Sequence, residues 1–450
     1  MPEQHSNHHS LLNPVAPIGI GTPEVESLIS YFCRLAASHC YSSSQLSRKI
    51  AREMGWKLHA KFIWQNQRMS GLYKTAIRWS TALSKLTANK QLDQLTLLPW
   101  RNVISSISLI SPSHRWCSVC LTDDRKEHRI PYFRLAWDIG VVTACARHKT
   151  ILTCTCPDCG RTDGRHNSAF VVPGWCVFCG AFLGDAKDSG PAESYEVWIA
   201  DQIGSMLAEQ AKLKAVPTSD KLFDGIRTLI KQLDFGESGA FARRIGLNKV
   251  TVHYWIKKRS TPTLAGHLRV VSHTGLELHK LLTGDLANWS YHCENVHPSS
   301  IRLPRKRRRR TPKDLDWDKI RSDLLVLCQS PVPISVAEAA RRLDLDPSQI
   351  RRSANQEAKI ISSRWKDHMR SRGRASRAIV SDAIVKACFE LAGEGKTISL
   401  RNVLRQLPPD ISGRIHDNFS LVKEVRAKIQ SGEIASPEDV TDKSDRNSSW

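Results

Sequence analysis

Four short motifs decide how this chain folds: Trp-Cys-Ser-Val-Cys (116–120), Cys-Ala-Arg-His (145–148), Cys-Pro-Asp-Cys-Gly (156–160) and Cys-Val-Phe-Cys-Gly (176–180). Each motif holds two metal-ligand residues separated by two positions, so that a tight turn can direct both side chains at one tetrahedral ion. The last two motifs have zinc-ribbon spacing, whereas a longer insertion separates the first two. The sequence therefore predicts two structural Zn²⁺ ions per chain, each with four protein ligands and no open position for catalysis. The expected ligands are Cys117, Cys120, Cys145, His148, Cys156, Cys159, Cys176 and Cys179.

The alternative interpretation of these cysteines is a set of disulfides or buried thiols. The pairing pattern argues against it, as does the lack of an apolar secretory signal at the N-terminus. Cys154 lies two residues before Cys156 and is left as a spare thiol, because Cys156 begins the complete motif. Five further cysteines are scattered singly along the sequence, as in a reducing compartment: Cys33, Cys40, Cys293, Cys328 and Cys388.

Composition indicates a multidomain protein with a polyanionic partner. The chain has 450 residues and a formal net charge of +22, and charge of this size favours nucleic acid. Residues 301–380 hold 21 Lys and Arg against 9 Asp and Glu, so the C-terminal half is the expected nucleic-acid end. No run of eighteen apolar residues is present, and we expect a cytoplasmic, DNA-associated protein.

The fold class that we predict is mainly α, with small zinc-ribbon-like modules. A disordered lead-in (1–20) precedes a helical region (21–115), in which apolar residues at helical spacing predict helices over 26–37 and 43–54. A double zinc-finger module (116–183) follows, and its aromatic run at 131–137 is interpreted as core.

The order of these motifs resembles the TniQ/TnsD family of transposon target-selection proteins. The resemblance rests on Glu-Ser-Leu-Ile-Ser-Tyr-Phe-Cys-Arg-Leu-Ala (26–36), Tyr-Phe-Arg-Leu-Ala-Trp (132–137) and the four cysteine motifs. One departure is Ser118, where family members often have Pro; the ligands are unaffected. The resemblance implies a non-catalytic adaptor that binds a chromosomal attachment site in double-stranded DNA. It also implies recruitment of an AAA+ ATPase regulator and, with it, transposase subunits.

A first helix-turn-helix domain is predicted within residues 195–290. In the segment 240–256, Gly246 permits a tight turn, Asn248 caps the second helix, and Val252 and Trp255 face inward. An unrelated helical hairpin would give the same pattern. The outer face that we expect to contact DNA consists of Lys249, Val250, His253, Tyr254 and Lys257.

A basic linker (300–313) follows this domain. Such a run is usually a solvated linker. Its position between candidate DNA-reading units instead favours contacts with phosphates or a narrow minor groove. The residues concerned are Arg305, Lys306, Arg307, Arg308, Arg309 and Arg310.

Two further helix-turn-helix-like domains, 314–375 and 376–432, precede a disordered tail (433–450). Residues 334–343 and 398–407 align at an offset of 64, and each would supply a first helix. In the first repeat Asp346 and Pro347 begin the second helix, leaving Ser348, Gln349, Arg351 and Arg352 for DNA. In the second repeat two prolines replace the turn, so that its recognition helix, near 412–416, is weakly specified. These tandem modules resemble the C-terminal half of TnsD-type members.

Three other functions compete with direct target selection. A TniQ-type adaptor would sit on an RNA-guided CRISPR effector complex, and a zinc-containing transcription regulator would bind DNA equally well. A two-metal nuclease or transposase would need carboxylates at strand ends in an α/β core. Neither alternating strands nor a convincing set of carboxylates is evident in the sequence. Because the segment 184–194 has linker composition, we also expect that cutting there separates a protein-binding half from a DNA-binding half.

Overall fold

The first two helices of the chain begin at serine caps. In the computed structural model, α1 (Leu28–Ser38) follows Ser27, whose side chain accepts a hydrogen bond from the Ser30 N–H. A capping box between Ser42 and Gln45 begins α2 (Ser43–Glu53). α1 is buried on nearly all sides and α2 buries one apolar face, and both helices lie where periodicity predicted them.

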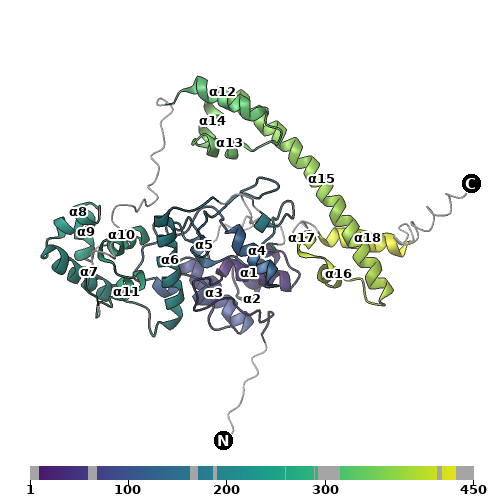
Figure 1. Cartoon of the computed structure of the whole chain (residues 1–450). Coiled ribbons are helices and arrows are strands. Elements are labelled where there is room, and N and C mark those ends of the chain that lie inside the picture. The colour runs from purple at the N-terminus through teal and green to yellow at the C-terminus, as the bar shows by residue number, and fades with distance from the viewer. Residues whose placement is uncertain are drawn as a thin grey trace, which may run out of the picture. The chain divides into compact units, whose positions relative to one another are not determined.

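The structure describes residues 10–58, 68–162, 171–185, 190–258, 260–287, 289–291, 315–412 and 418–431. Within these residues the regular structure is helical, and β structure is limited to isolated bridges. The chain divides into two compact units, mainly residues 1–303 and mainly residues 304–450, coloured purple to teal and green to yellow in Figure 1. None of the described helices combines the length and apolar character that a membrane crossing requires.

The N-terminal layer of the first unit packs around buried tryptophans. After α2 come α3 (Lys74–Thr87), η2 (Leu92–Leu95) and η3 (Leu98–Trp100). Trp79 and Trp100 are almost completely buried in this layer. Its structure begins earlier than the sequence predicted, because Leu12 is buried and its N–H donates to the Leu86 carbonyl over 2.9 Å.

The cysteine-rich region packs on this layer through Arg134, which also forms a buried ion pair within the region and reaches Glu24 over 3.1 Å. Its helices are α4 (Ser118–Lys126), α5 (Leu135–Asp138) and η4 (Leu183–Asp185). Arg134 donates to Asp124 over 2.6 and 2.8 Å, and both side chains are buried. The backbone of Arg134 also forms a bridge with Glu26, just before α1. Tyr132, Phe133 and Trp137 are buried, which confirms the aromatic run as core.

A third group of helices completes the first unit rather than forming a separate domain. It consists of α6 (Ser194–Glu209), η5 (Gln210–Lys212), α7 (Ser219–Asp234), α8 (Ser238–Arg244), α9 (Lys249–Ile256), α10 (Leu264–Thr274) and α11 (Leu278–Thr283). His267 is fully buried and its Nε2 lies 2.8 Å from the Val103 carbonyl oxygen. Gln210 donates to the Gln94 carbonyl, and Thr150 forms a bridge with Pro191. The predicted separation at 184–194 therefore differs from the structure, because tertiary contacts join both sides of that segment.

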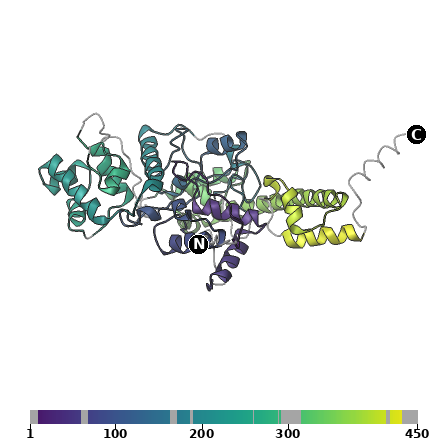
Figure 2. The same ribbon diagram turned by 90° about the horizontal axis from the view of Figure 1, so that it is seen from below.

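The second unit is organised along one long helix, α15. The unit contains α12 (Trp317–Cys328), α13 (Val336–Arg342), α14 (Pro347–Ser353), α15 (Asn355–Gly393), α16 (Leu400–Gln406) and α18 (Asn418–Gln430). The first three pack with the beginning of α15 around Leu324, Ala339 and Ile350. The last two contact its C-terminal part, beside which α18 lies in Figure 1 and Figure 2. The boundary predicted between 375 and 376 falls inside α15, because no Pro interrupts the helix there and Gly373 continues it.

Candidate metal centres and nucleic-acid interface

The first two cysteine motifs meet in one buried cluster. Cys117, Cys120, Cys145 and His148 bring their ligand atoms within 4.8 Å of one another. The Cys120 and Cys145 sulfurs are 3.6 Å apart, and the three Sγ–Nδ1 distances to His148 are 3.2–3.6 Å. Tetrahedral zinc would place such atoms about 3.6–3.8 Å apart. The donor set and its spacing therefore fit a four-ligand metal ion.

Two different local structures supply these ligands. Cys117 is the N-cap of α4 and accepts the Cys120 N–H at 3.5 Å, so the start of a helix directs both sulfurs. Cys145 and His148 lie in a turn, where the Lys149 N–H donates to the Cys145 carbonyl and the Cys145 N–H to that of Thr150. Lys149 has φ +54°, a left-handed conformation that closes the turn.

Electrostatics within this cluster favour one thiolate first. Hydrogen bonds from the Cys120 and Cys145 thiols lower the pKa of Cys117. Zinc binds the thiolate form of cysteine, so binding releases protons from the cluster.

Asp123 is a functional residue that sequence reasoning missed. Its Oδ2 lies 2.9 Å from Nε2 of His148, and the other ring nitrogen of His148 faces the three sulfurs. A carboxylate on the outer nitrogen fixes the tautomer and orientation of a ligating imidazole. The signal in the sequence is the position of Asp123, one helical turn after Cys120 in α4.

The last two motifs form a second cluster from four cysteines. Cys156, Cys159, Cys176 and Cys179 are all buried, and the Cys156 and Cys179 sulfurs are 3.6 Å apart. Gly160 and Gly180 follow the two motifs at φ +65° and +70°, as Lys149 follows the first cluster's turn. The same backbone turn therefore presents three of the four ligand pairs. Cys154 belongs to neither cluster, as predicted.

The first cluster lies within a recognised family domain. The family model described as TniQ matches residues 17–152. These residues form a TniQ family domain. TniQ proteins are non-catalytic transposition proteins associated with transposon target-site selection. The TniQ domain contains the first cluster and the buried Arg134–Asp124 pair, whereas the second cluster follows it. No curated protein matches the chain.

The predicted DNA-contact face of α9 is exposed. Gly246, at φ +64°, joins α8 to α9, and the Asn248 side chain accepts the Val250 N–H. Val252 and Trp255 are buried against the first unit's core, as expected. The five residues of the outer face are all exposed: Lys249, Val250, His253, Tyr254 and Lys257.

The second predicted DNA-contact set is only partly accessible. Asp346 caps α14 and Pro347 takes its first position, as predicted. Ser348, Arg351 and Arg352 are exposed. Gln349 differs, because its Oε1 accepts the Asp346 N–H in a capping box. The Gln349 side-chain oxygen that would contact a base is therefore already used to cap the start of α14.

Two predicted sets lie outside the described residues. The basic linker, Arg305 to Arg310, is one of them, and residues 413–416 of the recognition helix expected in the third helix-turn-helix-like domain (376–432) are the other. Around that gap the structure describes α16, a short α17 (Pro409–Ser412) and α18.

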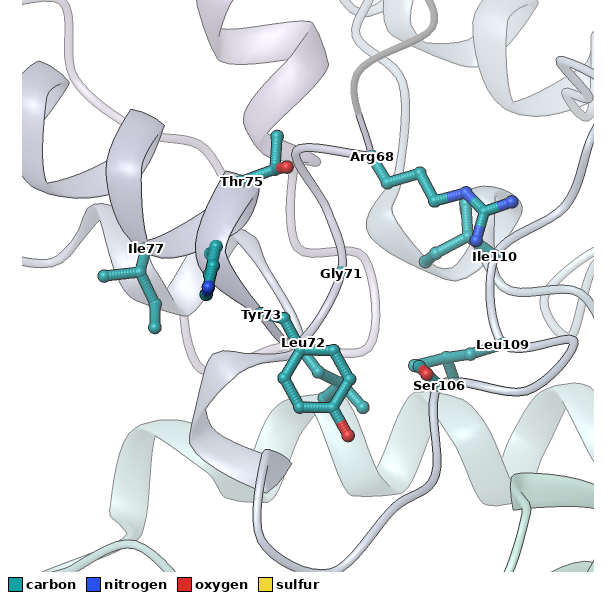
Figure 3. Close-up of a pocket in the computed structure, with 10 residues that line it drawn as sticks. Arg68, Gly71, Leu72, Tyr73, Thr75, Ile77, Ser106, Leu109 and Ile110 are labelled. Carbon is teal, nitrogen blue, oxygen red and sulfur yellow. The ribbon is translucent and has the colours of Figure 1, made fainter.

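The TniQ domain also has an apolar pocket of about 460 Å³ near the start of α3. Figure 3 shows Tyr73 and Ile77 on the α3 side, and Leu109 and Ile110 from the loop before the first cluster. Arg68 also lines it, and none of its lining residues is acidic. A cavity of this size accepts one or two large apolar side chains.

Proposed function

We propose that this protein selects the target site of a transposon by binding a specific attachment sequence in double-stranded DNA and recruiting the transposition machinery. The TniQ domain at residues 17–152 is the observation that carries this proposal. The protein partner would be an AAA+ ATPase regulator, and through it the transposase. The chain itself would perform no catalysis.

Each cysteine cluster would hold one structural Zn²⁺. The support is a closed set of four buried sulfur and nitrogen donors, at distances that fit tetrahedral coordination. The metal would hold the two halves of each cluster together, so that metal binding and folding are coupled. Asp123 would keep the His148 ring oriented.

DNA would be read by the exposed faces of α9 and α14. The α9 face combines cations with Val250 and Tyr254, which are 54% and 43% exposed. Apolar contacts of this kind can reach thymine methyl groups, while cations can bind guanine or phosphates. In α14 this role falls to Ser348, Arg351 and Arg352. The sequence of Arg305 to Arg310 supports a phosphate-binding linker.

The pocket at α3 would receive the protein partner. Tyr73 and Ile77 are 53% and 46% exposed, which is a large apolar area for a protein surface. Arg68 and Lys74 make no ion pair with a described residue, and the pocket has no acidic residue of its own. We therefore assign it an acidic segment of the ATPase that inserts an apolar side chain.

Selection of duplex DNA from a random library, with full-length protein and Zn²⁺, tests the function directly. We expect enrichment of one sequence and retention of the ATPase on that DNA only when the protein is present. A Val250→Ala, Tyr254→Ala variant should lose enrichment but still retain the ATPase. A Tyr73→Ala, Ile77→Ser variant should do the reverse.

The competing functions give different results in the same assay. Enrichment of one sequence without ATPase retention would favour a transcription regulator. If no sequence is enriched but the ATPase is retained, and an RNA-guided complex then restores target choice, the protein is an adaptor of that complex. The proposal is contradicted if the protein enriches no sequence and also fails to retain the ATPase.

A further inference from the structure

The middle of α15 is exposed and strongly basic. Residues 362–379 contain six Lys or Arg residues and a single acidic one, Asp367. None of these residues is buried, whereas α15 is buried before this segment, at Ile361, and after it, at Val380. A helical segment without a buried side chain is held by the elements at its ends rather than by its own packing.

Four of these cations form what we call the basic stripe. They are Lys366, Arg370, Arg374 and Arg377, and all four are exposed. Their spacing of four, four and three residues places them on one side of the helix. With a rise of about 1.5 Å per residue, the stripe is about 16 Å long.

The basic stripe is nearly without acidic partners in the described residues. Arg370 Nη1 lies 3.4 Å from Asp367, and both side chains are more than 60% exposed, which makes the pair weak. The other three cations form no ion pair within 4.0 Å of a described residue, although Glu424, which pairs with Lys428, also interacts with the charge of Arg377. Like charges four residues apart repel each other, so a polyanion would relieve strain that the chain itself leaves.

We propose that the basic stripe binds the phosphate backbone of duplex DNA. This inference rests on the proposed function and adds a contact that none of the predicted DNA-binding residues includes. Duplex DNA carries one negative charge per about 1.7 Å of its axis when both strands are counted, so a duplex about 16 Å long carries roughly ten phosphates, more than the four cations need. Three of the four cations are arginines, whose guanidinium groups bind phosphate oxygens through two hydrogen bonds.

The chemistry of the stripe favours DNA over an acidic protein. By helical spacing the large exposed apolar side chain of this segment, Ile379, lies on the side opposite the stripe, whereas protein interfaces are built around apolar anchors. Backbone contacts position a protein on DNA without reading its sequence. The stripe therefore adds affinity and salt dependence, and it leaves sequence preference to other residues.

Salt titration of the full-length zinc-loaded protein tests this inference. The probe is a 40-base-pair duplex of arbitrary sequence, since backbone contacts do not need the target. Changing all four stripe residues to Gln should flatten the slope of log K against log salt by about 3–4, because each phosphate contact contributes about 0.9. A matched control with Lys57, Lys85, Lys90 and Lys126 changed to Gln removes the same charge from exposed positions of the first unit. It should keep the wild-type slope.

Two further variants guard against misfolding. Arg370→Lys, Arg374→Lys, Arg377→Lys keeps the charge and should retain most of the slope. A single Arg374→Glu change should reduce the slope by about one, with unchanged helical circular dichroism. An unchanged slope in the Gln and Glu variants would overturn the inference, and so would equal flattening in the control.

The outcome separates this inference from the proposed function. Protein that binds the arbitrary duplex through the stripe but enriches no sequence keeps the inference and contradicts target selection. If the variant without the stripe still enriches a sequence and its salt slope equals that of the wild type, target selection is kept and the inference is contradicted. Loss of binding to polyglutamate without loss of binding to DNA would assign the stripe to an acidic protein instead. Failure of the wild type to bind duplex at low salt would contradict both.

Discussion

At the scale of single residues, the ligand positions are set by short-range backbone geometry and by one carboxylate from outside the motifs. The left-handed residues Lys149, Gly160 and Gly180 end three ligand turns in the same way. The structure adds Asp123, whose contact with His148 joins the end of one motif to a helix begun by another.

Asp123→Asn should weaken metal binding at the first cluster. The amide loses the negative charge that orients the His148 imidazole and raises its basicity, and such changes typically cost 10- to 100-fold in affinity. Competition with a chelator, followed by metal analysis of the protein, measures the loss. Glu127→Gln is the matched control, because Glu127 caps the end of the same helix and pairs with Arg129 and Arg147 rather than with His148. Equal affinity in both variants would show that Asp123 has no role in metal binding.

Glu26 should make stability depend on pH. Burial raises the pKa of its carboxyl to about 7, despite Arg34 Nη1 at 2.6 Å. Because the folded pKa lies above the unfolded value of 4.5, protonated Glu26 contributes stability that is fully present below pH 4.5. This contribution is lost as the pH rises through 7 and the buried carboxyl ionises. The shift corresponds to about 3 kcal/mol.

Denaturant unfolding of wild type and Glu26→Gln between pH 4.5 and 8, at constant free zinc, measures this contribution. The wild type should lose stability relative to the variant as the pH rises. Glu53→Gln, which changes an exposed carboxylate on α2, should follow the wild type. Parallel profiles for wild type and Glu26→Gln would mean that the carboxylate is charged throughout.

At the scale of elements, α15 continues as a helix through the domain boundary that the sequence repeat predicted at residues 375 and 376. The buried residues of α15 are confined to its two ends, and the segment between them has no apolar periodicity. Gly373 lies in that segment, and a Cβ added there meets nothing within 4 Å. Helix propensity and end packing alone therefore maintain its middle.

Gly373→Ala should stabilise the middle of α15 by about 0.5–1 kcal/mol, because Ala loses less backbone entropy than Gly in a helix. Amide hydrogen exchange of residues 365–380 should slow about 2- to 5-fold. Gly395→Ala is an opposite control: Gly395 has φ +67°, a conformation that costs Ala about 1 kcal/mol or more. Faster exchange in Gly373→Ala would indicate that the helix is bent at this glycine.

At the scale of the whole molecule, the first compact unit extends well beyond the TniQ domain. Helices α6 to α11 share buried contacts with it, including the His267–Val103 hydrogen bond and the close approach of Gly204 to Pro23. The chain can therefore be cut after residue 291 without separating these packed helices, whereas a cut within 184–194 would separate them.

A fragment of residues 1–291 should therefore fold cooperatively with Zn²⁺, whereas a fragment of residues 1–186 should not. The shorter fragment exposes the surface that α6 and α10 cover, including the segment around Val103. Thermal unfolding and limited proteolysis compare the two fragments at equal zinc occupancy. Equal melting temperatures would show that the helices after residue 194 contribute nothing to the stability of the TniQ domain.

The sequence by itself determined the local features: the two clusters of four potential ligands, the serine-capped helices, the exposed face of α9 and the cap of α14. These follow from ligand spacing, capping residues and helical periodicity, which act over a few neighbouring positions. Only the tertiary structure decided which distant groups meet. Asp123 reaches His148, α6 to α11 join the first unit, and α15 runs through a predicted boundary, because such contacts depend on packing between segments that are far apart in the chain.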